Sequence, residues 1–262
     1  MNQIEVKHFY DSFKNKLIND FLAPNIRIEN AIKLAIKNIP KSSKSVLDLG
    51  FGLGWSSYEI AKHFPEAQIN GFDISEELTR TAKDLFKVSN LSYKSMDLTQ
   101  FFPKGSFDAI VLLDVFEHIP VSARETFYVN IQNSLSEQGR VILTCPTIFH
   151  QNYLRKNNPA GLQPVDENVD LNVILDFASK TETNLAHFEY LNIWNSRDYF
   201  FAIIERPYKY HTSHINQYEK KINLLDFYSK YSLLKVSNLS NSMLPELSLK
   251  QKLKLRLKST AN

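Results

Sequence analysis

The sequence predicts an α/β protein in which a mostly parallel sheet of seven strands lies between two layers of helices. Between residues 46 and 144, short apolar segments of strand length alternate with segments of helical length. This alternation is typical of parallel sheets, because each return to a parallel strand requires a crossover. In addition, Gly50, Gly52 and Gly54 directly follow the first apolar segment. Glycines at a strand end let the backbone turn sharply and approach a ligand.

The individual elements follow in order from the apolar spacing. Apolar residues at helical spacing over 9–21 and 28–36 predict two amphipathic helices, with Pro24 as the break between them. The polar run at 41–45 then leads into a short buried strand at 46–49. The alternating segments that follow predict helices at 56–63, 76–87 and 122–135 and strands at 68–72, 91–94, 107–113 and 140–144.

Beyond Pro146 the pattern loosens and allows two interpretations. In the first, a helix at 166–180 precedes two strands, at 188–194 and 199–204, that close the sheet as an antiparallel hairpin. In the second, 151–206 is an insertion, the last core helix starts at 214–218, and the next strand is 233–239. The first gives three parts: a helical amino-terminal segment at 1–40, a core at 41–207 and an extension at 208–262.

Composition restricts the class of protein. A chain of 262 residues with 43% hydrophobic content can bury one main core with a modest extension. The single cysteine, Cys145, excludes a disulfide framework and a multi-cysteine zinc site. No apolar run approaches the roughly 18 residues that cross a bilayer. The amino-terminal residues also lack the pattern of a signal peptide, so we expect a cytoplasmic protein without a membrane span.

The charge is concentrated at the carboxyl end. Residues 246–262 contribute +4 to a net charge of +3, which leaves −1 for the rest of the chain. A nucleic-acid partner would normally require a basic stripe across the folded body, so we expect none. Leucines and cations alternate in this basic tail, which indicates an edge strand with a basic outer face. Attraction to an anionic membrane surface is the alternative.

Acidic residues lie within or at the ends of four of the predicted strands. Asp48 precedes the first glycine by two residues, and Asp73, Asp97 and Asp114 lie at the ends of later strands. Because the carboxyl ends of parallel strands share one edge, these carboxylates line one crevice. An acidic crevice suits a ligand with ribose hydroxyls, an amino group and a positive centre better than a pyrophosphate. Trp55 also replaces the third glycine of the dinucleotide fingerprint, which argues against a nicotinamide or flavin cofactor.

These residues together resemble the class I S-adenosylmethionine-dependent methyltransferases, of the type that acts on small molecules. The resemblance covers 46–144 and rests on Leu-Asp-Leu-Gly-Phe-Gly-Leu-Gly at 47–54, Gly-Phe-Asp-Ile-Ser at 71–75, Met-Asp at 96–97, Leu-Asp-Val-Phe-Glu-His-Ile-Pro at 113–120 and Gly-Arg-Val-Ile-Leu-Thr at 139–144. Phe51 is a departure, since many relatives carry a small residue or cysteine there. The family implies a Rossmann-like three-layer sandwich, S-adenosylmethionine as cofactor and S-adenosylhomocysteine as product.

The resemblance also implies which residues contact the methionine and ribose parts of the cofactor. The backbone at Gly50, Gly52 and Gly54 passes the methionine end, and Asp48 orients this loop and reaches the amino group through water. Asp73 holds both ribose hydroxyls through charge-assisted hydrogen bonds. For each aspartate the alternative is a solvated loop or a helix cap.

For the adenine part, the resemblance implies that Ile74 and Met96 enclose the ring and that Asp97 accepts a hydrogen bond from its exocyclic amine. The backbone around Leu113 and Asp114 faces the methionine moiety.

Three further residues are candidates from the resemblance. His118 could serve as a general base, and its alternative is a structural role. Tyr10 belongs to an amino-terminal segment that often closes over the cofactor as a lid, and its alternative is core packing. Arg27 could bind the cofactor carboxylate or an acidic substrate, and its alternative is a solvated residue at a helix start. The pair His211 and His214 has metal-ligand spacing but lacks further ligands, so we predict no metal site.

The sequence therefore predicts an enzyme that methylates an oxygen or nitrogen of a small molecule, such as a sugar or secondary metabolite. The first alternative is methylation of RNA or protein, although residues 114–117 lack the Asn-Pro-Pro-Tyr signature of amino-directed nucleic-acid enzymes. The second alternative is a subunit that binds the cofactor without catalysis. The sequence specifies neither the acceptor nor the oligomeric state.

Overall fold

The computed structural model describes residues 3–23 and 25–207. The extension at 208–262, its basic tail, His211 and His214 lie outside the described residues, as does Pro24. The three-part division of the chain stays a prediction.

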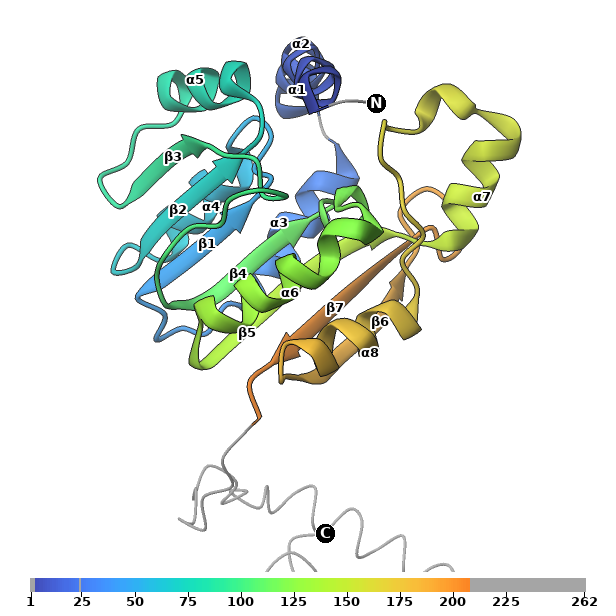
Figure 1. Cartoon of the computed structure of the whole chain (residues 1–262). Coiled ribbons are helices and arrows are strands. Elements are labelled where there is room, and N and C mark those ends of the chain that lie inside the picture. The colour runs from blue at the N-terminus through green and yellow to red at the C-terminus, as the bar shows by residue number, and fades with distance from the viewer. Residues whose placement is uncertain (1–2, 24, 208–262) are drawn as a thin grey trace, which may run out of the picture. The chain divides into compact units, whose positions relative to one another are not determined.

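The described part of the chain contains a seven-stranded sheet in the order β3-β2-β1-β4-β5-β7-β6 (Figure 1). Strands β1 to β5 run parallel, and β7 pairs antiparallel with both β5 and β6. The strands are β1 Ser45–Leu49, β2 Gln68–Asp73, β3 Leu91–Ser95, β4 Phe107–Leu113, β5 Leu135–Pro146, β6 Asn184–Leu191 and β7 Tyr199–Glu205. The prediction of a mostly parallel sheet with an antiparallel final hairpin is therefore confirmed, and β6 and β7 support the first interpretation of the region beyond Pro146.

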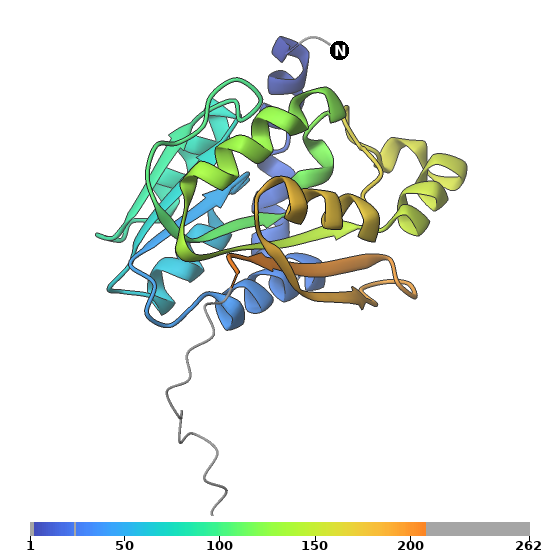
Figure 2. The same ribbon diagram turned by 60° about the horizontal axis from the view of Figure 1, so that its bottom comes forward.

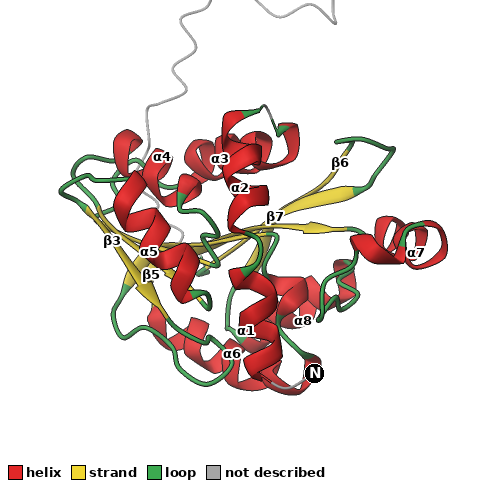
Figure 3. Cartoon of the chain, turned by 90° about the horizontal axis from the view of Figure 1, so that it is seen from above, coloured by secondary structure: helices red, strands yellow, loops and turns green. Residues whose placement is uncertain are grey.

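Helices cover both faces of this sheet. The helices of the described residues are α1 Gln3–Asp11, α2 Lys14–Leu22, α3 Ile26–Asn38, α4 Trp55–His63, α5 Glu76–Leu85, α6 Val121–Ser134, α7 Ile148–Asn157 and α8 Leu171–Lys180. Two short 3₁₀ turns are η1 Phe116–His118 and η2 Pro159–Gly161. Helices α3 and α4 lie on one side of the sheet, and α6 and α8 lie on the other (Figures 2 and 3).

The two faces of the sheet form two separate apolar layers. On one face, Leu47 of β1 packs with Phe127 of α6 and Phe177 of α8. On the other face, Val46 of the same strand packs with Ile60 of α4. Side chains alternate between the faces of a strand, so a strand covered on both sides must be apolar along its length. This requirement explains the continuous apolar runs in the sequence.

The structure differs from the predicted elements at several places, including β6, which was predicted at 188–194 and lies at Asn184–Leu191. The single helix expected over 9–21 is two helices, because the chain turns at Ser12, whose hydroxyl donates to the Phe9 carbonyl at 2.6 Å. The predicted helix at 166–180 begins only at Leu171, where Asp170 caps it by accepting from the Val173 N–H at 3.0 Å. Helix α7 was not predicted at all, and it starts at the Thr147 cap.

The order of the strands also determines where ligands bind. Strands β2 and β3 follow β1 on one side of it, whereas the next strand in the sequence, β4, pairs with the opposite side of β1. In open α/β sheets this reversal leaves a crevice beyond the carboxyl ends of the two central strands. Figure 1 shows α1 and α2 beyond these strand ends.

Candidate functional site

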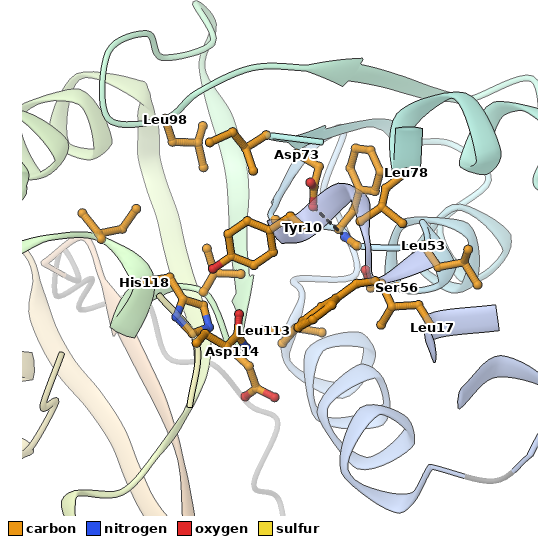
Figure 4. A pocket seen from close by; sticks show the side chains of 18 of the residues that line it. Tyr10, Leu17, Leu53, Ser56, Asp73, Leu78, Leu98, Leu113, Asp114 and His118 are labelled. Atoms are coloured by element: carbon orange, nitrogen blue, oxygen red, sulfur yellow. Dashed lines mark hydrogen bonds between the residues drawn. The ribbon is translucent and has the colours of Figure 1, made fainter. Parts of the chain in front are cut away.

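A cavity of about 550 Å³ lies at the carboxyl ends of β1, β2 and β4. Its size is within the usual range of pockets for small ligands. Most of the residues predicted to form the site line this cavity: Tyr10, Arg27, Gly50, Gly52, Asp73, Ile74, Met96, Asp97, Leu113, Asp114 and His118. Figure 4 shows the ring of Tyr10 between Asp73 and His118. Asp48 and Gly54, which were also predicted, do not line it.

The glycine loop after β1 forms one wall of the cavity. Gly52 has a φ of +58°, and a Cβ added there would meet only Leu17 Cδ1, at 3.4 Å. Gly54 has a φ of +96°, and a Cβ there would lie 2.7 Å from the Cβ of Ala82 and 2.9 Å from the Tyr93 hydroxyl. Both positions therefore favour glycine, but for different reasons. Gly54 packs against the protein itself, whereas Gly52 leaves open space beside the cavity.

Asp48 connects β1 to the helix that follows the loop. Its Oδ2 accepts hydrogen bonds from the hydroxyls of Ser56 at 2.7 Å and Ser57 at 2.6 Å. Burial raises the pKa of Asp48 to about 6, although the two serine hydroxyls act in the opposite direction. The structure thus places Asp48 beneath the loop. Its predicted contact with the cofactor amino group stays a prediction.

Asp73 lies on the cavity wall at the end of β2. Its Oδ1 accepts from the Ser75 N–H at 2.9 Å and its Oδ2 accepts from the Gly52 N–H at 2.8 Å (Figure 4). Burial raises the pKa of Asp73 to about 6, and these two hydrogen bonds counteract the rise. Each carboxylate oxygen has two lone pairs, so one direction on each oxygen is available to a ligand. Two such acceptors side by side suit a pair of neighbouring hydroxyls.

The next wall combines apolar side chains with a carboxylate. Ile74 and Met96 line the cavity beside Asp97. The Asp97 Oδ1 accepts from the N–H of Thr99 at 2.9 Å and from its hydroxyl at 2.6 Å, so Asp97 closes a turn after β3. Its Oδ2 remains an acceptor for a ligand. The two interpretations of Asp97, a turn residue and a ligand contact, are compatible.

Arg27 and Asp114 form an ion pair at the end of β4. Asp114 has a φ of +56° and accepts from the Thr144 hydroxyl at 2.7 Å. The Arg27 guanidinium also lies over the ring of Tyr199, 5.8 Å from its centroid. Arg27 lies in the first turn of α3 with 24% of its side chain exposed, and its predicted contact with the cofactor carboxylate or an acidic substrate stays a prediction.

His118 lies in η1, on the cavity side of β4. Its Nδ1 lies 2.6 Å from the Val165 carbonyl oxygen and 3.3 Å from the Asp166 carboxylate. Burial lowers the pKa of His118, which keeps the imidazole neutral at pH 7. Its ring is in edge contact with that of Tyr10, with 6.2 Å between the centroids. Tyr10 therefore lies in the cavity next to the candidate base.

Helices α1 and α2 are fastened to the start of α5 at three points. The Asp11 carboxylate accepts from the Ser75 hydroxyl at 2.5 Å and from the Glu77 N–H at 3.4 Å. Lys7 and Lys14 form ion pairs with Glu76 and Glu77, at 2.6 and 2.8 Å. We call these contacts the α1–α5 latch. They hold Tyr10 over the cavity.

Several site residues were missing from the sequence prediction. Phe13, Val115 and Gln163 line the cavity, and Asp11 and Asp166 hold residues that line it. Asp11 directly follows Tyr10 in the sequence, so the prediction of Tyr10 already indicated that Asp11 lies beside the site. No sequence pattern indicated Asp166, because it is 48 residues from His118 in the sequence.

Within 3–23 and 25–207, no three His, Cys, Asp or Glu side chains are grouped so that they could hold a metal ion. Over the same residues, no helix is both long enough and apolar enough to cross a membrane.

Comparison with known proteins identifies relatives. Residues 46–139 match the family model described as "Methyltransferase domain". The chain is 29% identical over 170 residues to tocopherol O-methyltransferase, chloroplastic, of Arabidopsis thaliana, covering 63% of this chain and 43% of that protein. It is also 29% identical over 108 residues to phosphoethanolamine N-methyltransferase 2 of Caenorhabditis elegans, covering 40% of this chain and 24% of that protein. The chain thus spans less than half the length of these two relatives.

The fold has a solved counterpart in N-methyltransferase NodS from Bradyrhizobium japonicum in complex with S-adenosylhomocysteine. The TM-score is 0.61 at 17% sequence identity, over 76% of this chain and 99% of that one. At this identity the likeness supports the Rossmann-like methyltransferase fold.

Proposed function

Because the chain belongs to the class I S-adenosylmethionine-dependent methyltransferases, we propose that it transfers a methyl group from S-adenosylmethionine to an oxygen or nitrogen of a small molecule. One observation carries this proposal. A left-handed glycine loop and a buried carboxylate that accepts from that loop, Asp73, face one cavity at the crevice where the strand order reverses.

The residues present fit the cofactor. Asp73 offers two acceptor oxygens for the two ribose hydroxyls, and Gly52 leaves room for close backbone approach. Ile74 and Met96 offer apolar surface for the adenine ring, with Asp97 as an acceptor for its amine. Arg27 and Lys16 are cations that line the cavity, and the guanidinium of Arg27 suits the methionine carboxylate. The bound cofactor supplies a methyl group on a positively charged sulfur, which a lone pair can attack.

The protein's own residues then have to position the acceptor and remove its proton. We assign proton removal to Nε2 of His118, which lines the cavity as part of a neutral imidazole. Tyr10 and the α1–α5 latch close the cavity and exclude water from the reacting atoms. A cavity of about 550 Å³ has the size of small-ligand pockets, which supports a small-molecule acceptor rather than RNA or protein. The two relatives are an O-methyltransferase and an N-methyltransferase, which supports either reacting atom.

Binding of S-adenosylhomocysteine, measured by isothermal titration calorimetry, tests this proposal. We expect one site per chain. If the protein releases no heat with either S-adenosylhomocysteine or S-adenosylmethionine, the proposal is wrong. Binding without turnover on any acceptor would instead favour the alternative of a non-catalytic subunit.

The affinity should also depend on pH through Asp73. A ribose hydroxyl donates to the carboxylate, and the pKa of this group is raised from 3.8 to about 6, so protonation competes with the ligand. We expect the association constant for S-adenosylhomocysteine to rise about tenfold from pH 5 to pH 7 and then level off.

Two variants identify the group that titrates. Asp73→Asn should remove the pH dependence of the association constant, whereas Asp48→Asn should keep it, although the pKa of Asp48 is also raised to about 6.

The contribution of Asp73 to stability should change with pH in the opposite direction to its contribution to binding. The native state binds the extra Asp73 proton between pH 4 and 6, so the contribution of Asp73 to the free energy of unfolding falls as pH rises through this window. A pH-independent association constant in the wild type would contradict the assignment.

The α1–α5 latch should control how fast the ligand leaves. Replacing Asp11 by alanine removes the acceptor for the Ser75 hydroxyl and the Glu77 N–H. We expect the dissociation rate of S-adenosylhomocysteine to increase about fivefold, the effect of about 1 kcal/mol of lost hydrogen bonding. Stopped-flow fluorescence of Trp55, which lines the cavity, measures this rate.

Lys7→Ala is the matched control for the latch. Its ion pair with Glu76 is exposed, with 35% and 70% of the two side chains accessible, so its loss should change the rate less than twofold. Equal rates in Asp11→Ala and the wild type would show that the latch does not limit release.

A further inference from the structure

The hydrogen bonds of His118 determine which of its ring nitrogens carries the proton. Nδ1 lies 2.6 Å from the Val165 carbonyl oxygen, which can only accept. The neutral imidazole has one N–H, so that hydrogen is on Nδ1. Nε2 therefore has a free lone pair. The Glu117 carboxyl lies 3.8 Å from it, which is beyond hydrogen-bonding distance.

The segment that holds Nδ1 is itself fixed to the helical turn that carries His118. The Asp166 Oδ2 accepts from the Gln163 N–H at 2.8 Å, which leaves Oδ1 facing the imidazole at 3.3 Å. The Glu167 N–H donates to the Glu117 carbonyl at 2.9 Å. Residues 163–167, which we call the brace, thus contact η1 both at the imidazole and at the Glu117 backbone. Only 13% of the Asp166 side chain is exposed, so its charge is weakly screened.

The charges around the ring differ in their effect on a protonated His118. Asp166 favours the imidazolium, whereas Arg27 disfavours it. Glu117 lies in the same turn, but burial raises its pKa to about 8, so it is neutral at pH 7. Tyr10, on the side of α1, is also neutral, because burial raises its pKa. Asp166 is therefore the acidic side chain that contacts the ring and favours its protonated form.

We propose that Asp166 and the Val165 carbonyl position His118 as the base of the methyl transfer, holding the Nδ1–H tautomer and stabilising the imidazolium that forms. This inference rests on the proposed function. The acceptor is then a hydroxyl or an ammonium group, whose reacting atom carries a proton to be removed. That proton goes to Nε2, the acceptor atom forms the new bond to the methyl carbon, and the electron pair of the broken carbon–sulfur bond stays on sulfur. The imidazolium later releases its proton to solvent.

Imidazole ¹⁵N NMR of the full-length protein tests this positioning without a known acceptor. A His118→Gln variant assigns the signals. We expect the wild type to show Nδ1–H and an unprotonated Nε2 at pH 8. In Asp166→Asn, the acid dissociation constant of His118 should be about tenfold larger, because a carboxylate in contact with the ring is lost.

Asp170→Asn is the matched control. It changes a carboxylate in the same stretch of chain to an amide, but Asp170 caps α8 and accepts from the Val173 N–H rather than contacting His118. Its His118 titration should equal that of the wild type. An Nε2–H tautomer in the wild type, or an unchanged dissociation constant in Asp166→Asn, would overturn the proposal. Failure of the wild type to bind S-adenosylhomocysteine would instead contradict the proposed function, so the two outcomes can be separated.

Discussion

Replacing Asp73 by alanine is expected to weaken the binding of S-adenosylhomocysteine about 100-fold. The substitution removes both acceptor oxygens that face the cavity, and hydrogen bonds to a charged group each contribute about 1.5 to 3 kcal/mol. The same substitution also frees the N–H groups of Gly52 and Ser75, so part of the loss could come from a disordered loop. Titration calorimetry at pH 7.5 measures the affinity, and chemical denaturation measures the stability.

Asp108 provides a matched control for this experiment. It too accepts two backbone N–H groups, from Lys44 at 2.7 Å and Ser45 at 3.1 Å, but it lies at the amino end of β4, on the opposite edge of the sheet. Asp108→Ala should cost similar stability and leave the affinity unchanged. If the two alanine variants bind equally well, Asp73 does not hold the ribose.

Replacing Gly54 by alanine is expected to lower the free energy of unfolding by about 3 kcal/mol or more. The new Cβ would lie 2.7 Å from that of Ala82, which is fully buried, and the φ of +96° adds backbone strain. Gly52→Ala should cost only about 1 kcal/mol, since its φ of +58° lies in the left-handed helical region and its Cβ has room. Urea denaturation of the two variants measures this difference.

The two glycine variants should rank in the reverse order when the affinity of the folded protein for S-adenosylhomocysteine is compared. At a temperature where both variants are folded, Gly52→Ala should bind S-adenosylhomocysteine more weakly than Gly54→Ala, because only Gly52 lines the cavity. Equal destabilisation of both proteins, or normal binding by Gly52→Ala, would contradict the assignment of Gly54 to packing and Gly52 to ligand binding.

The main features of the sheet could be predicted because its strands are short, buried on both faces and separated by amphipathic helices. β1, with four of its five residues buried, gives a short, largely apolar run that carries the single carboxylate of Asp48. Helix α7 could not be predicted in the same way. Apolar residues such as Phe149 and Tyr153 remain 57% and 56% exposed, so its sequence lacks the periodic face of a core helix.

Within the site, residues next to strand ends could be placed from the sequence, because the carboxyl ends of parallel strands share one edge. Asp73 and Asp114 are examples. Gly54 was expected at the cavity but packs against Tyr93 and Ala82, a contact between α4, β3 and α5 that no local pattern encodes. The contact of Asp166 with His118 likewise depends on how the brace folds back over η1. Such contacts between distant segments arise only from the tertiary fold.

A crystal structure of the protein with S-adenosylhomocysteine tests the central claim most directly. We expect both ribose hydroxyls within hydrogen-bonding distance of the Asp73 carboxylate and the homocysteine part alongside Gly52. Ligand density outside this cavity, or an Asp73 side chain turned away from the ribose, would contradict the claim.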